Sequence, residues 1–160
     1  MAKNHFIVPT LPLGTVTVAR LGAGNAVGDR YSDVDVGKFV KLAGESRYDL
    51  TAVGNPIEGV VVAVETATSN GYSVGSVLTD DDSRIFATAD GLQATPGTGV
   101  IAVGDYVVTG TVVAKGTAMS GYPKVCKATS QTFGAFAWRV VSLGQVGTGA
   151  AGTTIVIERV

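Results

Sequence analysis

The side chains that could support covalent catalysis are few, because the chain has one histidine, His5, and one cysteine, Cys126. A Ser-His-Asp triad or a Cys-His pair needs an imidazole as its general base. His5 lies in a predicted extended arm at the N-terminus, where chains are least ordered. Cys126 lies in an alternating strand pattern, which is typical of a small packed apolar side chain. We therefore expect no catalytic residue and predict that the protein is not an enzyme.

Two groups of aspartates could bind a hard cation. Asp29, Asp33 and Asp35 resemble fragments of a calcium loop, but their order does not meet the EF-hand pattern and no glutamate occupies the bidentate position. The run 80–82 is typical of a solvated turn, so weak cation binding at either group remains the alternative to no metal site. Carboxylate pairs for glycoside chemistry could be drawn from three further residues, but nothing fixes their separation: Glu45, Glu58 and Glu65.

Two further features suggest ligands. The glycine-rich loop 22–28 is similar to a dinucleotide fingerprint, but its third glycine is one place late and no helix is expected to follow. We therefore expect a turn and no cofactor. Trp138 and Arg139, with Phe133 and Phe136 nearby, could stack on a sugar or a base, but aromatic residues in a strand more often belong to the core, which is the interpretation we favour.

Composition narrows the class of protein. The 160 residues suit about one domain; 46% are hydrophobic, only 16% are charged, and 22 are glycine. With a net charge of −1 and scattered basic residues, a nucleic-acid partner is not expected. A single cysteine allows no internal disulfide, and no stretch is apolar enough for a signal peptide or a membrane span. We expect a protein made in the cytoplasm whose apolar surface associates with itself or with a larger partner.

The strand pattern occurs twice along the chain. Each set opens with Val-Gly and continues with a strand after a tyrosine, a valine-rich strand and a closing strand, over residues 36–79 and 103–159. No window shows sustained helical periodicity. We predict an all-β fold, a jelly-roll-like sandwich or barrel, with an extended N-terminal arm and loop over 1–28 and a single β domain over 29–160. The sequence leaves open whether the two sets form one barrel or two lobes.

Three segments are similar to the small β-rich head decoration, or cement, proteins of tailed bacteriophages: Val36 to Leu42, Asn55 to Val61 and Val103 to Val107. The resemblance implies a non-enzymatic virion protein on the outer capsid surface, made in the host cytoplasm, which stabilises the shell at junctions between major capsid protein subunits. It implies no cofactor, and it implies a homo-oligomer, for which we favour a trimer over a dimer. The alternatives are a tail or fibre module and a carbohydrate-binding β-sandwich module.

If the resemblance holds, the apolar arm is the first candidate for contact with a partner. Pro9 and Pro12 interrupt strand pairing there, so the arm needs a neighbouring surface, either its own barrel or another subunit. We expect four residues to contact the capsid or a neighbouring copy: Phe6, Ile7, Leu11 and Leu13.

Overall fold

The computed structural model describes residues 16–66, 68, 70–81, 83–130 and 136–160. These residues form eleven strands and two single-turn 3₁₀ helices, η1 (Val27–Asp29) and η2 (Asp33–Asp35). The predicted all-β fold is confirmed, and of the barrel and the sandwich that the sequence left open, the structure forms closed barrels. No helix among the described residues has the length and hydropathy needed to cross a lipid bilayer.

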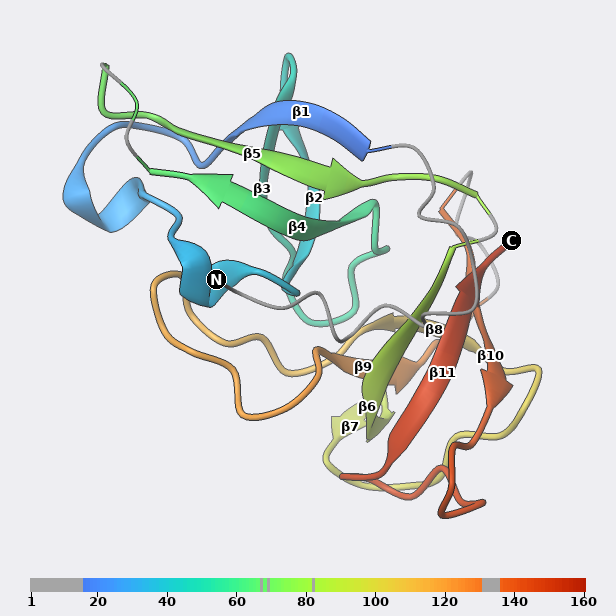
Figure 1. Ribbon diagram of the computed structural model, residues 1–160. Helices are drawn as coiled ribbons and strands as arrows, with labels where there is room; N and C mark the ends of the chain where they lie inside the picture. Colours follow the sequence, from blue (N-terminus) through green and yellow to red (C-terminus); the bar gives the residue numbers. More distant parts are fainter. Residues whose placement is uncertain (1–15, 67, 69, 82, 131–135) are drawn as a thin grey trace.

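The first barrel lies in the upper part of Figure 1 and uses the strands nearest the N-terminus. They are β1 (Val16–Leu21), β2 (Phe39–Gly44), β3 (Arg47–Leu50), β4 (Gly59–Glu65) and β5 (Ser73–Leu78). The order around the barrel is β1-β3-β2-β4-β5, and β5 closes it by pairing with β1. A barrel of this kind leaves few strand edges for unwanted pairing.

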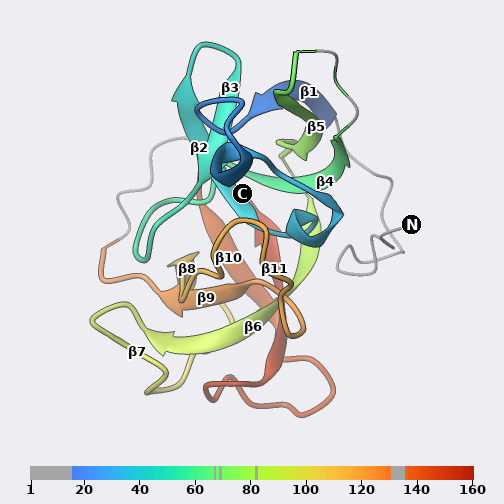
Figure 2. The same ribbon diagram turned by 90° about the vertical axis from the view of Figure 1, so that its left-hand side faces the viewer.

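The second barrel lies below the first and contains the remaining strands (Figures 1 and 2). They are β6 (Arg84–Leu92), β7 (Thr95–Pro96), β8 (Tyr106–Thr109), β9 (Lys124–Lys127), β10 (Trp138–Ser142) and β11 (Thr154–Arg159). The order is β11-β10-β8-β9-β6, with the short β7 added beyond β6, and a pairing of β11 with β6 closes the barrel.

Both barrels follow one pairing scheme. Each barrel has one parallel strand pair, which we call its parallel seam: β1–β3 in the first and β6–β9 in the second. The other pairs are antiparallel, and each antiparallel pair of one barrel has an equivalent in the other. Equivalent glycines precede β2 and β8: Gly37 donates to Val61 O at 2.7 Å, and Gly104 donates to Val140 O at 2.8 Å. Their φ values are 95° and 89°, a region that favours glycine, which explains why Val-Gly occurs twice in the sequence.

The same glycines correct the strand bounds expected from sequence. Strands were expected to begin at Val36 and Val103, whereas β2 begins at Phe39 and β8 at Tyr106. Gly37 and Gly104 adopt their positive φ values in turns, so each Val-Gly pair precedes the strand and lies outside it.

The apolar core continues from one barrel into the other. The interior of the first barrel contains Leu21, Tyr31, Val40, Val61 and Val77. A larger cluster joins the interior of the second barrel to residues of the first: Phe39, Ile57, Val60, Val62 and Leu78 pack with residues that include Ile85, Trp138 and Ile157. Burial of each large aliphatic or aromatic side chain contributes about 1.5–3 kcal/mol, so this cluster holds the two barrels together.

Candidate functional site

The four arm residues proposed for partner contact, Phe6, Ile7, Leu11 and Leu13, lie outside the described residues, as does His5. The structural evidence on function therefore comes from the described residues, which begin at Val16.

Cys126 is fully buried on β9, as its strand pattern indicated. Its Sγ lies 3.5 Å from the carbonyl oxygen of Asp90 and 3.9 Å from that residue's Oδ2. Burial, followed by the nearby Asp90 carboxylate, raises the pKa of the thiol to about 11. The thiol is therefore held in the protonated form, which is a poor nucleophile.

We expect Cys126 to be unreactive in the folded protein. At pH 8 the native chain should not react with a disulfide reagent such as DTNB over an hour, whereas the chain in guanidinium chloride should release one equivalent of chromophore. Because the pKa is raised from 9.0 to about 11 on folding, the unfolded thiol ionises first, and the free energy of unfolding should fall as the pH rises through this interval. Rapid labelling of the native chain at pH 8 would contradict this description.

Trp138 belongs to the core, as favoured from the sequence. Its exposure is 1%, and its Nε1 donates to Ile57 O at 2.9 Å, which links β10 to the segment before β4. The indole therefore has no free face for a sugar or a base, and Phe133 lies outside the described residues. Among the residues the structure describes, no three His, Cys, Asp or Glu side chains cluster closely enough to hold a metal ion.

Asp35 is one of the three aspartates that resemble fragments of a calcium loop, and protein groups surround its carboxylate. It is fully buried on η2 and forms an ion pair of 2.6 Å with the buried Lys38. The same oxygen accepts from Gly116 N at 2.8 Å, and the other oxygen accepts from Ser32 N at 2.9 Å. Both carboxylate oxygens accept hydrogen bonds from the protein, so the role of this carboxylate is structural.

Lys38 attaches a loop of the second barrel to the first barrel. Its ammonium donates to Ala114 O and Thr117 O, each at 2.7 Å, besides Asp35. These carbonyls belong to loop 110–123, which joins β8 to β9 and approaches η2 in both Figures 1 and 2. Three acceptors match the three donors of an ammonium group, so the buried charge is satisfied.

Loop 110–123 has further anchors. Asp90 accepts from Thr111 N at 2.7 Å and from Thr111 Oγ1 at 2.6 Å, where the loop leaves β8. Lys115 lies 3.3 Å from Asp49 Oδ1 and its ammonium lies 4.8 Å from the centre of the Tyr31 ring. The equivalent connection in the first barrel, β2 to β3, needs only Glu45 and Ser46. The long loop is therefore the main departure of the second barrel from the shared scheme.

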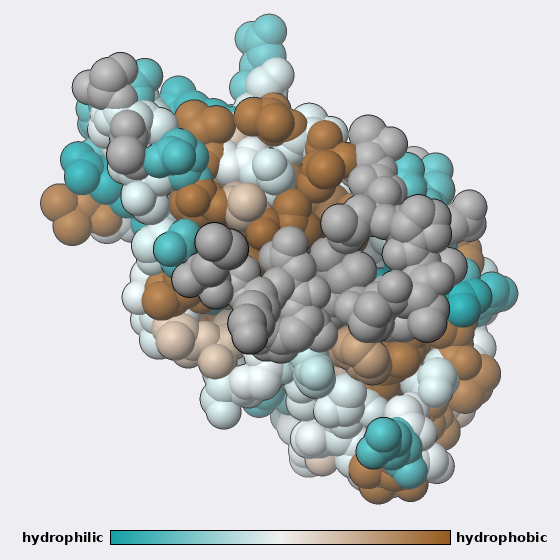
Figure 3. Space-filling model, in the orientation of Figure 1, coloured by the Kyte–Doolittle hydropathy of each residue, from teal (hydrophilic) through white to brown (hydrophobic). Residues whose placement is uncertain are grey.

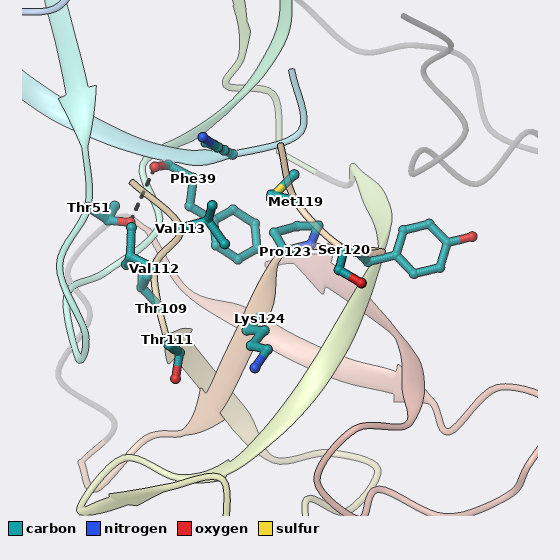
Figure 4. A pocket seen from close by; sticks show the side chains of 12 residues that line it. Phe39, Thr51, Thr109, Thr111, Val112, Val113, Met119, Ser120, Pro123 and Lys124 are labelled. Carbon is teal, nitrogen blue, oxygen red and sulfur yellow. Dashed lines mark hydrogen bonds between the residues drawn. The ribbon is translucent and has the colours of Figure 1, made fainter. Parts of the chain in front are cut away.

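A cavity of about 190 Å³ lies beneath this loop. Figure 4 shows Phe39, Val113, Met119 and Pro123 around it, with Lys124 below. The hydroxyl group of Thr51 donates a hydrogen bond to the backbone oxygen of Phe39 at 3.3 Å. Most of the surface that lines the cavity is apolar, and the cavity lies between the loop and the barrels.

The most distinctive surface lies toward the lower end of the second barrel in Figure 1. It consists of residues 91–104 and 143–153, which contain no charged residue; we call it the uncharged end. The two segments are adjacent, because Ile101 N donates to Gly149 O at 2.9 Å and Val100 bridges Ala150. A Cβ on Gly149 would lie 1.8 Å from Ile101 O, so this close approach requires glycine.

The uncharged end presents apolar side chains to solvent. Val100, Val103 and Val146 are 59%, 60% and 68% exposed. The lower end of the molecule in Figure 3 is accordingly mostly pale and brown. Exposed apolar surface without charges is typical of protein contact sites, and the many glycines keep the backbone close to any partner.

The surface was not recognised from the sequence, which drew attention to the arm. Its signal was present as two long runs without Asp, Glu, Lys or Arg, but only the structure shows that the runs meet. A scan of family models and a search of the curated proteins found no match to this chain.

Proposed function

We propose that the protein is a non-enzymatic virion component that binds the outer surface of a phage capsid and stabilises it at junctions between major capsid protein subunits. The observation that carries the proposal is the uncharged end, which suits a dry, apolar contact with a larger surface. The sequence resemblance to cement proteins supports the same role.

Two closed barrels with a shared core suit a mechanical role. Strand pairing around each barrel and continuous packing between them resist deformation, because backbone hydrogen bonds and core contacts must break together. A protein that binds in many copies to a repeating lattice needs only modest affinity per site, because linked contacts raise the overall affinity above that of any single contact.

The test is binding to purified shells that lack this chain, measured by co-sedimentation and quantified against the major shell protein. Val103→Asp combined with Val146→Asp should weaken binding by about 100-fold or more, because two unpaired carboxylates would have to be desolvated at the contact. The control is Val27→Asp, at a valine on η1 of the first barrel that is more exposed than either, and this variant should bind as the wild type does.

The copy number separates the outcomes. Stoichiometry near that of the shell lattice supports the proposal. A few copies per particle would instead indicate a tail or fibre component, and absence of binding to shells would contradict any capsid role. Equal loss of binding in the Val27 control would show that the uncharged end is not the contact surface.

A further inference from the structure

The first barrel is incompletely closed along its parallel seam. β3 pairs with β1 only at Arg20 and Leu21, whereas β5 pairs with the whole of β1. Because Arg20 N donates to Ser46 O on the β3 side, the alternation of strand hydrogen bonds directs the N–H and C=O of Val16 and Val18 to that side too. Within the described part of the chain, no strand pairs with them there.

The parallel seam of the second barrel begins at the equivalent point of its first strand. This seam extends from Leu92 back to Thr88, and Thr88 N donates to Pro123 O at 2.9 Å, at the end of loop 110–123. In the first barrel the equivalent bond, from Arg20 N to Ser46 O, comes from the short turn between β2 and β3. Val16 and Val18, on the same face of β1 as Arg20, are 44% and 70% exposed. An exposed edge with β-branched residues is a template for an added strand.

Two arginines lie at the closed end of this edge. Arg20 and Arg47 are partners in the register of the seam. Arg20 donates to Ala23 O and lies over the Tyr72 ring, and Arg47 donates to Ala43 O. The Nε atoms of both are buried and, among the described residues, lack a hydrogen-bond partner. Neither guanidinium forms an ion pair with a carboxylate of the described residues.

We propose that the open edge of β1 accepts an extended acidic segment of a shell subunit as an added strand, whose carboxylate lies against Arg20 and Arg47. This inference rests on the proposed function and names a second contact, on the opposite barrel from the uncharged end. Backbone hydrogen bonds to Val16 and Val18 position the added strand, and the two guanidinium groups at the end of the edge select for negative charge.

The experiment removes one edge donor. Val18→Pro deletes an N–H that points away from β5, so the barrel pairing is kept, while Val18→Thr retains the N–H and serves as the control. Val18→Pro should bind shells at least about 10-fold more weakly than Val18→Thr, with unchanged circular dichroism. Arg47→Gln should weaken binding and reduce its salt dependence, whereas Arg30→Gln, at an exposed arginine bonded to Asn25 O, should change neither.

A labelled peptide tests the edge without the shell. The probe is acetyl-Thr-Val-Thr-Val-Asp-Asp, compared by fluorescence polarisation with the same peptide ending in Asn-Asn. Preferential binding of the acidic probe to the wild type, lost in Val18→Pro, supports strand addition.

The outcomes distinguish the two proposals. Shell binding that Val18→Pro and Arg47→Gln leave intact, but that Val103→Asp with Val146→Asp removes, overturns the edge contact and leaves the proposed function in place. Failure of the wild type to bind shells overturns the proposed function and the assignment to a shell subunit. Markedly tighter probe binding after deletion of residues 1–13 would show that the chain's own N-terminal segment occupies the edge, which also overturns the assignment.

Discussion

Replacing Lys38 by Met should lower the free energy of unfolding by about 3–5 kcal/mol, the effect expected when one partner of a buried ion pair is removed. The Asp35 carboxylate would remain fully buried with only uncharged donors beside it, from Ser32 and Gly116. The carbonyls of Ala114 and Thr117 would lose their donor, so loop 110–123 would also lose its attachment to the first barrel.

The measurement is urea unfolding followed by fluorescence, for which Trp138 is the only tryptophan. Lys41→Met is the matched control, because Lys41 is half-buried and its ammonium donates to Asn55 Oδ1 at 3.2 Å, its one side-chain bond within the described residues. A change of about 1 kcal/mol or less is expected. Asp35→Leu combined with Lys38→Met should recover part of the loss by removing the uncompensated charge. A Lys38→Met variant as stable as the control would show that the ion pair does not hold the loop.

Replacing Trp138 by Ala should cost about 3–5 kcal/mol, because a large side chain in the joint core would leave a cavity. The indole packs among residues of both barrels and donates to Ile57 O, so the change acts on the junction between them. We expect the thermal transition to broaden or to divide in two, as the barrels lose part of the packing that makes them unfold together.

Scanning calorimetry and circular dichroism provide the readout, since the variant has no tryptophan. Trp138→Phe separates the two contributions: it keeps most of the apolar volume and loses the hydrogen bond, so a cost between about 1 and 3 kcal/mol is expected. If Trp138→Phe proved as destabilising as Trp138→Ala, the hydrogen bond to Ile57 would outweigh the packing.

Local sequence chemistry predicted which segments form strands, but it placed the two Val-Gly turns inside them. Gly37 and Gly104 precede β2 and β8 because only glycine readily adopts their φ values, and that requirement is visible as a repeated Val-Gly. The closure of two separate barrels could not be predicted, since it depends on pairing between distant strands, such as β1 with β5 and β6 with β11. Chain order does not determine register.

The candidate site was less accessible to sequence reasoning than the fold. The ion pair of Asp35 with Lys38 was not predicted, because the loop that buries it lies more than seventy residues further along the chain. The uncharged end required the meeting of Ile101 with Gly149. Trp138 was predictable as core, because a tryptophan inside an alternating strand is usually packed.

The arrangement of each barrel from consecutive strands also has a consequence for biosynthesis. By Leu78 the ribosome has made every strand of the first barrel and none of the second. The first barrel can therefore close during translation, as N-terminal units generally do, while its lower face, with Ile57, Val60 and Leu78, remains uncovered until β6 to β11 emerge. Until then the nascent chain exposes an apolar surface. Completion of the second barrel covers this surface and so protects the chain from aggregation.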